Sequence, residues 1–456
     1  MTNIMRRMLR LLAISVALLA PASAAWAESL NQALEAAYAS NPTILAARAG
    51  QRAIDERVPQ ALSGWRPTVT VNGGLTHDWV NSPATAFNTD KRLNGSMSIT
   101  LRQPVFRGFA TVEGVKSAEA NVRAGQQNLL ATEQNTLFNA VQAYMNVYAD
   151  RQLVALQREN VSVLRAQLNA ANERFNVGEI TRTDVAQSRA SLSQAQASLA
   201  NAEATLAADV ARYLQLIGKE PGKLTYPKIA KLPKSLQSAL ATAGEINPSI
   251  LAAAFVEDAA QHDIEVAKAP LLPEIALQAE AGMQDDWSRD NTSVESASVG
   301  AVLSWNLYAG GQVHSSIRQA KQLASQKRIQ VVEVARAVRQ AVAASWNAYA
   351  ALGQIITAAK AQVAASQLAL DGVRQEYDAG TRTTLDVLNA QAAVVSARTT
   401  LVTAERNRVI AAYQLLAAIG HLTADQLGLK VAVYDPTVNY DAVRNKWIGT
   451  DVETVE

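Results

Sequence analysis

The sequence predicts a mainly α-helical fold that also carries transmembrane β-strands, with the same order of elements occurring twice. Three observations predict this fold. Segments recur at a constant offset along the 456-residue chain. Four stretches of about ten residues alternate between apolar and polar side chains, as membrane strands do. Long stretches without proline carry apolar or small residues about every 3.5 positions, which is the spacing of coiled coils.

The segment 1–27 has the pattern of a secretory signal peptide. Three arginines precede an apolar run over 11–20, and Ala25-Trp26-Ala27 forms a small-residue cleavage site. A membrane-spanning helix needs roughly 20 apolar residues, so we expect cleavage before Glu28 rather than the alternative, an uncleaved anchor. Without the leader, acidic and basic residues nearly balance, and no basic patch predicts a nucleic-acid partner.

Several function classes are excluded or disfavoured by composition. The chain has no cysteine, which excludes disulfides, thiolate metal sites and a lipoprotein anchor. Beyond the leader we expect no helical membrane span, so membrane insertion would need strands. The segment 218–223 lacks P-loop spacing and reads as a linker. Histidines are expected at the surface or in loops, without metal-ligand spacing; they are His77, His262, His314 and His421. We therefore expect no enzyme activity, no metal and no cofactor.

The chain is an internal duplication. Asn41-Pro42 returns as Asn247-Pro248, and Phe175-Asn176-Val177-Gly178 returns as Tyr377-Asp378-Ala379-Gly380. The predicted organisation is a signal peptide (1–27), a first repeat (28–219; strands about 66–80 and 92–106, long helices about 109–175 and 182–217), a linker (220–234), a second repeat (235–420; strands about 273–286 and 295–308, long helices about 312–377 and 384–418) and a C-terminal segment (421–456).

The strands favour a membrane sheet over a soluble one. A half-buried soluble sheet alternates too, but aromatic residues lie near the strand ends, as at a membrane interface; they are Trp65, Trp79, Phe106, Trp287, Trp305 and Tyr308. Four strands cannot close a barrel, since bacterial barrels have about eight or more. The smallest barrels are filled by side chains. Three chains, with twelve strands together, are therefore favoured over two.

The long helices are predicted to pack as coiled coils around a hollow. A helix from Thr111 to Phe175 would be roughly 95 Å long at about 1.5 Å per residue. Its seam is apolar or small except at Asp150 and Gln157. Gly178 and Gly380 end the long helices, and each is followed by an alanine-rich returning helix.

Several segments together resemble the TolC family of outer-membrane efflux and secretion channels, of the type without a lipid anchor. They are 101–106, 308–311 and, most specifically, 377–388. The resemblance covers essentially the whole mature chain. It implies a homotrimer with a twelve-stranded β-barrel continuous with a long α-helical coiled-coil barrel. It also implies an equatorial girdle that takes in the 220–234 linker and the segment after Gly420.

By this resemblance, the protein is a passive exit duct of a tripartite efflux pump or type I secretion system. It would lie in the outer membrane, contact its lipid and extend into the periplasm. Implied partners are a periplasmic adaptor (membrane fusion) protein and an inner-membrane RND or ABC transporter. Two alternatives are a periplasmic or surface coiled-coil structural protein without channel activity, and a secreted enzyme on a repeat scaffold.

The candidate functional residues lie at the two helix breaks. Asp184 and Asp386 fall in the first turn of the returning helices. There a carboxylate either stabilises the helix N-terminus or contributes to a ring that selects cations at a pore entrance. The resemblance implies further roles: a gate network of Asp184, Tyr377 and Arg382, a pore constriction at Asp386 and Asn389, and adaptor contacts at Gly178, Thr181, Gly380 and Thr381. At Asn389 the family's best-known member has a second acid, so we expect a less negative entrance here.

Overall fold

The computed structural model describes residues 28–80, 90–287 and 292–452, so the predicted signal peptide lies outside the described residues. The chain divides into two compact units, and each takes segments from both repeats. Within the described residues, unit 1 comprises 28–44, 133–241 and 341–433, and unit 2 comprises 45–132, 242–340 and 434–452. Each repeat therefore contributes to both units instead of forming a unit of its own.

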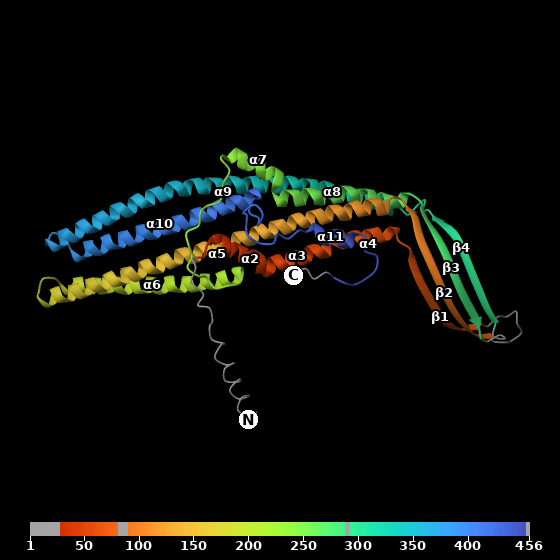
Figure 1. The fold of residues 1–456 in the computed structure, drawn as a ribbon, viewed down its shortest axis with the longest axis horizontal. Coiled ribbons are helices and arrows are strands. Elements are labelled where there is room, and N and C mark those ends of the chain that lie inside the picture. Colours follow the sequence, from red (N-terminus) through yellow and green to blue (C-terminus); the bar gives the residue numbers. More distant parts are fainter. Residues whose placement is uncertain (1–27, 81–89, 288–291, 453–456) are drawn as a thin grey trace, which may run out of the picture. The chain divides into compact units, whose positions relative to one another are not determined.

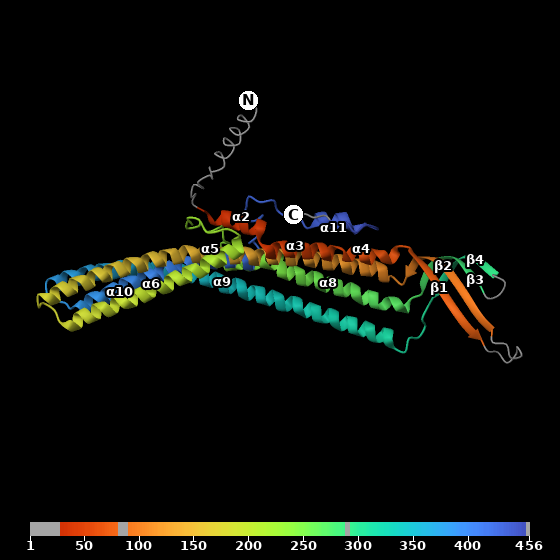
Figure 2. The same ribbon diagram turned by 90° about the horizontal axis from the view of Figure 1, so that it is seen from below.

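Unit 1 is built from helices. Its elements are α2 (Leu30–Ser40), the later part of α5 (Ala110–Asn176), α6 (Arg182–Ile217), the later part of α9 (Gln312–Asp378) and α10 (Thr384–Ile419). Figures 1 and 2 show α6 running beside α5, and α10 beside α9, as two helical hairpins. The long helices α5 and α9 each have 67 residues, and α6 and α10 each have 36.

The core of unit 1 gathers at the base of these hairpins. Buried residues come from α2, α5, α6 and α10, with Tyr38, Tyr144 and Tyr213 among the largest fully buried side chains. Burying one large apolar side chain is worth about 1.5–3 kcal/mol. This cluster therefore holds the hairpin bases together, while the outer parts of the helices depend on narrower seams.

Unit 2 contains the sheet and shorter helices. Its elements include most of α3 (Pro42–Asp55), α4 (Arg57–Leu62), the 3-10 turn η1 (Ser63–Trp65), α8 (Pro248–Lys268), the 3-10 turn η2 (Ala269–Leu271) and α11 (Thr437–Arg444). The helix α7 (Leu236–Ile246) is divided between the two units. The earlier parts of α5 and α9 follow the second strand of each repeat and belong to unit 2.

The sheet has four antiparallel strands in the order β1-β2-β3-β4. They are β1 (Thr68–Val80), β2 (Asp90–Arg107), β3 (Glu274–Asp286) and β4 (Thr292–Ser304). Each repeat supplies one hairpin, and the β2–β3 pairing joins the two repeats, with a bulge between Pro104 and Phe106. The sheet ends at β1 on one side and at β4 on the other, so both outer edges lack a neighbouring strand within the described chain.

One face of this sheet is apolar across all four strands. Directly opposite residues of paired strands point to the same face. One row across the sheet is Val69, Leu101, Ala279 and Val299. The next row, on the other face, is Thr70, Thr100, Glu280 and Ser298. The apolar row is exposed in the single chain, since the Val299 side chain is 87% exposed and that of Val69 is 66% exposed. The strand register therefore aligns the alternation of separate strands into one mainly apolar and one polar surface. Glu295, opposite Met283, is a charged exception on the apolar side.

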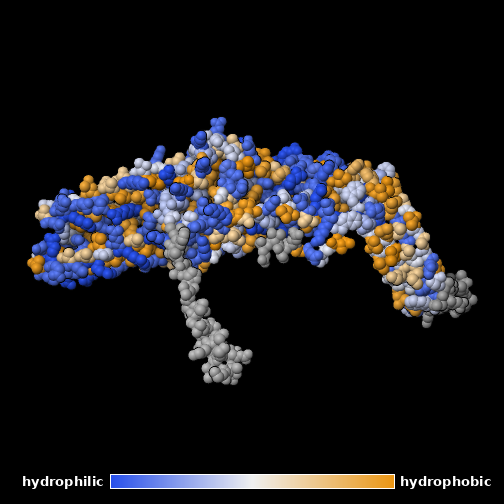
Figure 3. Space-filling view, in the orientation of Figure 1, coloured by the Kyte–Doolittle hydropathy of each residue, from blue (hydrophilic) through white to orange (hydrophobic). Residues whose placement is uncertain are grey.

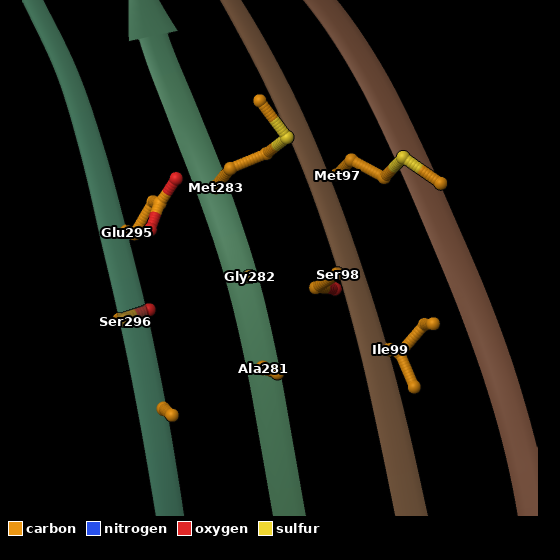
Figure 4. A pocket seen from close by; sticks show the side chains of 9 residues that line it. Met97, Ser98, Ile99, Ala281, Gly282, Met283, Glu295 and Ser296 are labelled. Carbon is orange, nitrogen blue, oxygen red and sulfur yellow. The ribbon is translucent and has the colours of Figure 1, made fainter.

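Apolar side chains gather over the strands in Figure 3. Between β2, β3 and β4 the surface forms a hollow of about 520 Å³, lined by residues that include Met97, Ile99 and Met283. Figure 4 shows these three side chains along β2 and β3, with Glu295 reaching from β4 toward β3. An exposed apolar surface of this kind marks a membrane or protein contact.

The observed elements differ from the expected ones in two respects. The last strand ends at Ser304, whereas we expected strand to about 308. The stretch from Leu236 to Leu271 contains an 18-residue window that is apolar enough to span a membrane, although we expected no such helical stretch after the leader. It is not one continuous helix, because Asn247 caps α8 and Pro248 begins it.

A carboxylate lies buried in the seam of the first helical hairpin. Asp150 on α5 was one of two polar exceptions in the predicted seam; it is 5% exposed, and its Oδ2 has no hydrogen-bond partner in the described chain. Burial, and then the neighbouring carboxyl of Asp209 on α6, raise the pKa of Asp150 to about 6, against the opposing effect of Arg406 on α10. The folded hairpin therefore favours the protonated form of Asp150.

Asp150→Asn should remove a pH dependence of stability. Because the folded-state pKa of Asp150 is raised, its contribution is complete below its ordinary pKa of 3.8 and is lost as the pH rises through about 6. The amide imitates the protonated carboxyl. Above pH 6 we expect the free energy of unfolding of the variant to exceed that of the wild type by up to about 3 kcal/mol. Thermal unfolding followed by far-UV circular dichroism between pH 4 and pH 8 measures this.

The matched control is Asp425→Asn, which changes an exposed aspartate of the same unit. This control should keep the pH profile of the wild type. If Asp150→Asn also keeps that profile, the protonation of Asp150 does not contribute to the stability of unit 1.

Candidate functional site

The turns that join α5 to α6 and α9 to α10 have the same backbone geometry. The φ angles of Gly178 and Gly380 are +82° and +80°. Their N–H groups donate to the carbonyl oxygens of Phe175 and Tyr377, each at 3.0 Å. A residue with a β-carbon adopts this left-handed conformation only at a cost. The repeated glycine therefore ends each long helix and reverses the chain.

Each returning helix begins with a capping box. In the first tip, Thr181 Oγ1 accepts from the N–H of Asp184 at 3.3 Å, and Asp184 Oδ2 accepts from the N–H of Thr181 at 3.0 Å. In the second tip, Thr383 and Asp386 make the same two bonds at 3.3 and 3.0 Å. The threonine hydroxyls also donate to the same carboxylate oxygens, at 2.7 and 2.8 Å. Both acids therefore satisfy N–H groups that the helix leaves without partners.

The Asp386 carboxylate is held in its charged form. The N–H and hydroxyl of Thr383, followed by the nearby Arg382 guanidinium, lower the pKa of Asp386 below its ordinary value. The hydrogen bonds to this carboxylate end on Oδ2, and within the described chain none ends on Oδ1. Asp386 therefore presents a negative charge at the tip while it caps α10.

Tyr377 and Arg382 lie at the second tip but contact different residues. The Arg382 Nε donates to Glu376 Oε2 at 2.7 Å, and both side chains are about half exposed. Hydrogen bonding to Glu376, and then its charge, raise the pKa of Arg382 further above its usual range. Tyr377 Oη lies 3.4 Å from Thr384 Oγ1.

The two hairpins meet at the tips through Arg174. Its guanidinium carbon lies 4.6 Å from the centre of the Tyr377 ring, and its Nε donates to Glu179 Oε2 at 2.9 Å. A guanidinium over an aromatic face is attractive. Arg174 thereby connects the end of α5 to the end of α9 within one chain.

The structure does not join the predicted gate residues directly in a single chain. Within the described residues, no hydrogen bond or ion pair connects Asp184 with Tyr377 or Arg382. Asn389 is exposed on α10, one turn after Asp386. The gate and the constriction therefore remain predictions about neighbouring hairpins.

The four candidate adaptor contacts are all exposed at the tips. Gly178 and Gly380 have open space where a β-carbon would lie. Thr181 is the N-cap of α6, and Thr381 donates from Oγ1 to the Glu376 carbonyl at 2.9 Å. They shape the turns and leave the outer surface of both tips free within one chain.

Sequence reasoning missed Arg174 and Glu376. Aligning the repeats on Phe175 and Tyr377 places Arg174 opposite Glu376, which reverses the charge at equivalent positions. Each residue forms an ion pair within its own tip, with Glu179 and Arg382 respectively. A charge reversal inside an otherwise repeated motif is the signal that would have identified both.

The histidines were expected at the surface or in loops. His77 in β1 and His314 in α9 are exposed, and His262 in α8 is partly buried. His262 Nδ1 is 2.7 Å from Glu113 Oε2 in unit 2. Over the residues that the structure describes, no group of three or more possible metal ligands occurs.

Comparisons with known proteins agree with this architecture. A family model described as outer membrane efflux protein matches residues 33–219 and 239–421. The outer membrane efflux protein BepC of Brucella suis is 41% identical over 428 residues, covering 93% of this chain and 92% of that protein. The outer membrane protein TolC of Escherichia coli is 30% identical over 233 residues, covering 46% of this chain and 47% of that protein.

A solved structure shows the same fold at low sequence identity. The CmeC outer membrane channel of Campylobacter jejuni has a TM-score of 0.77 at 14% identity, covering 91% of this chain and 89% of that chain. The predicted fold class and the resemblance to TolC are confirmed. Because one family model matches both repeats and a relative aligns over nearly its whole length, this chain belongs to the outer membrane efflux protein family.

Proposed function

We propose that three copies of this chain form a passive exit duct for a tripartite efflux pump, a type I secretion system, or both. The chain is an outer-membrane protein of the efflux family. In the proposed trimer, the three sheets close a twelve-stranded barrel, and the helical hairpins continue it as a tube through the periplasm. Removal of the leader before Glu28 precedes assembly.

The observation that carries the proposal is the sheet with one exposed apolar face and two open edges. Unpaired backbone groups in hydrocarbon cost several kcal/mol each. A sheet with an apolar face is therefore compatible with lipid only when its edges are paired. Copies of the chain supply the missing partners, β1 of one copy beside β4 of the next.

The tips support a gated entrance at the periplasmic end. Asp386 offers a charged carboxylate, and Asn389 follows one turn later without charge. Asp184, Tyr377 and Arg382 are proposed to hold neighbouring hairpins closed, and Asp386 with Asn389 to form the constriction. The exposed turns at Gly178, Thr181, Gly380 and Thr381 are proposed to meet the periplasmic adaptor, which links the duct to an RND or ABC transporter.

The two alternative functions are less well supported. A coiled-coil structural protein would not need an apolar, edge-open sheet, and the family to which the chain belongs consists of efflux proteins. A secreted enzyme would need converging catalytic groups, whereas the family is one of transport ducts. A passive duct has no chemistry to drive, so the energy for export comes from the transporter.

The first test is single-channel recording from the purified protein in planar bilayers, together with its mass in detergent by light scattering. We expect a trimer with small, cation-selective currents, because an acidic constriction admits cations preferentially. A monomer or dimer without conductance would overturn the barrel and favour the coiled-coil alternative.

Arg382→Ser should raise the conductance severalfold. The substitution removes the guanidinium that is proposed to tie neighbouring hairpins, and it also frees Glu376. The matched control is Arg182→Ser, since Arg182 is exposed at the other tip. Single-channel conductance is measured for both variants. An unchanged conductance in Arg382→Ser, or an equal rise in Arg182→Ser, would refute the proposed gate.

Asp386→Asn should reduce cation selectivity more than Asp184→Asn. Both substitutions remove the same capping carboxylate, so their effects on the helix ends match. Of these two aspartates, Asp386 is proposed to line the constriction, whereas Asp184 is not. Reversal potentials in a salt gradient give the selectivity of each variant. Equal shifts in the two variants would show that selectivity follows from helix capping and not from a constriction at Asp386.

A further inference from the structure

Glu28, the first residue of the predicted mature chain, is almost fully enclosed. It is 7% exposed, and its backbone forms a parallel bridge with Leu224 in the linker between the repeats. Charged residues are rarely buried unless they are paired. Such burial at a chain end is unexpected because ends are usually poorly ordered unless they are tied down.

Three donors hold the Glu28 carboxylate. The Tyr213 hydroxyl donates to Oε1 at 2.8 Å, the Gly222 N–H donates to Oε2 at 3.0 Å, and Lys219 Nζ lies 2.9 Å from Oε1. Burial alone would raise the pKa of Glu28, but the donors, Lys219 foremost, hold it below its ordinary value. The site therefore binds the ionised carboxylate.

The backbone N–H and carbonyl of Glu28 are also hydrogen-bonded. Its N–H donates to the Lys223 carbonyl at 2.8 Å, and its carbonyl accepts from the Thr225 N–H at 3.2 Å. The fully buried Tyr144 hydroxyl lies 2.8 Å from the same carbonyl and 2.7 Å from the carbonyl of Thr225. Glu28 thus connects linker residues 219–225 to α5 through Tyr144 and to α6 through Tyr213.

The residues directly after Glu28 are fixed in place. Ser29 is the N-cap of α2 in a capping box with Gln32, and Leu30 is buried in the core of unit 1. The position of Glu28 is therefore set by α2 on one side and by the linker on the other. Removal of the residues before Glu28 therefore changes the chemistry of its nitrogen and leaves the rest of the residue in place.

We propose that leader removal before Glu28 creates a structural N-terminus. The new α-amino group binds the Lys223 carbonyl, and Glu28 becomes a clamp that fastens the linker to the base of the first helical hairpin. Proteolytic processing and the final packing of unit 1 are thereby coupled. The inference rests on the proposed leader removal but not on the duct activity.

A free amino group suits this site better than an extended chain does. The α-ammonium has three N–H donors where a peptide nitrogen has one, and a charged donor makes the stronger hydrogen bond. A retained residue would leave a neutral peptide N–H in place of the charged donor, and the bond to the Lys223 carbonyl would therefore be weaker.

The unmodified protein provides the first test. Its N-terminal peptide is identified by mass spectrometry and should begin at Glu28. The folded trimer and the urea-unfolded chain are then treated at pH 7 with N-hydroxysuccinimidyl acetate, which favours α-amino groups because their pKa is about 7.7–8.0 against about 10.4 for lysine. We expect at least about tenfold slower acetylation of Glu28 in the folded protein, since its nitrogen is hydrogen-bonded to the Lys223 carbonyl. Equal rates, or a different first residue, would overturn the proposal.

Variants test the clamp itself. Insertion of Gly-Ser between Ala27 and Glu28 keeps the cleavage site but extends the mature chain, and it should lower the thermal midpoint by several degrees. Gly-Ser appended after Glu456 is its control. Glu28→Gln should also lower the midpoint, because its amide loses the ion pair with Lys219 and offers one acceptor oxygen where three donors converge. Glu220→Gln, an exposed linker position, is the matched control.

The outcomes separate this inference from the proposed function. A wild-type midpoint in the extended chain would overturn the role of the α-amino group, even if its channel conducts. A protected amine in a protein without conductance would support the clamp and refute the duct. Labelling of the unmodified chain keeps the inference testable if Glu28→Gln fails to fold.

Discussion

Backbone hydrogen bonding at the outer edges of β1 and β4 is the constraint on which the rest of the structure depends. Each of these strands has 13 residues and pairs on one side only within the described chain. Water could satisfy such edges, but lipid cannot. The apolar face of the same sheet is compatible with lipid and not with water. Pairing between copies would resolve both demands, and this argument underlies the proposed trimer.

The duplication gives each strand hairpin a helical hairpin of its own. Because α5 follows β2 and α9 follows β4, every strand hairpin is continued by one helical hairpin. The repeats also place the same glycine turn and the same capping box at both tips. Against this shared geometry, Arg174 and Glu376 reverse the charge, and Tyr377 replaces Phe175. The Arg174–Tyr377 contact has no equivalent between Glu376 and Phe175, because glutamate carries no cation.

Periodicity in the sequence was enough to predict the elements but not their partners. Alternation at Val69 and Val299 predicted strands, and the register then placed both residues in one apolar row. The sequence predicted Asp150 as a polar exception in the apolar seam of α5. It did not predict the neighbouring Asp209, because the two residues come together only when α6 folds back on α5. The pairing of Glu28 with the linker joins residues almost 200 positions apart, and no local pattern predicts it. Residue type and spacing determine local structure, whereas long-range pairs depend on packing.

The two interpretations of the tip carboxylates are compatible once the individual oxygens are considered. A carboxylate has two oxygens with about four acceptor sites. In Asp184 and Asp386 the capping bonds all end on Oδ2. Capping therefore fixes the orientation of both side chains without occupying Oδ1, and in Asp386 it also lowers the pKa of the carboxyl. A constriction needs a charge whose position is fixed and whose free face remains available to a passing ion. Helix capping thus supplies the rigidity that a selective carboxylate requires.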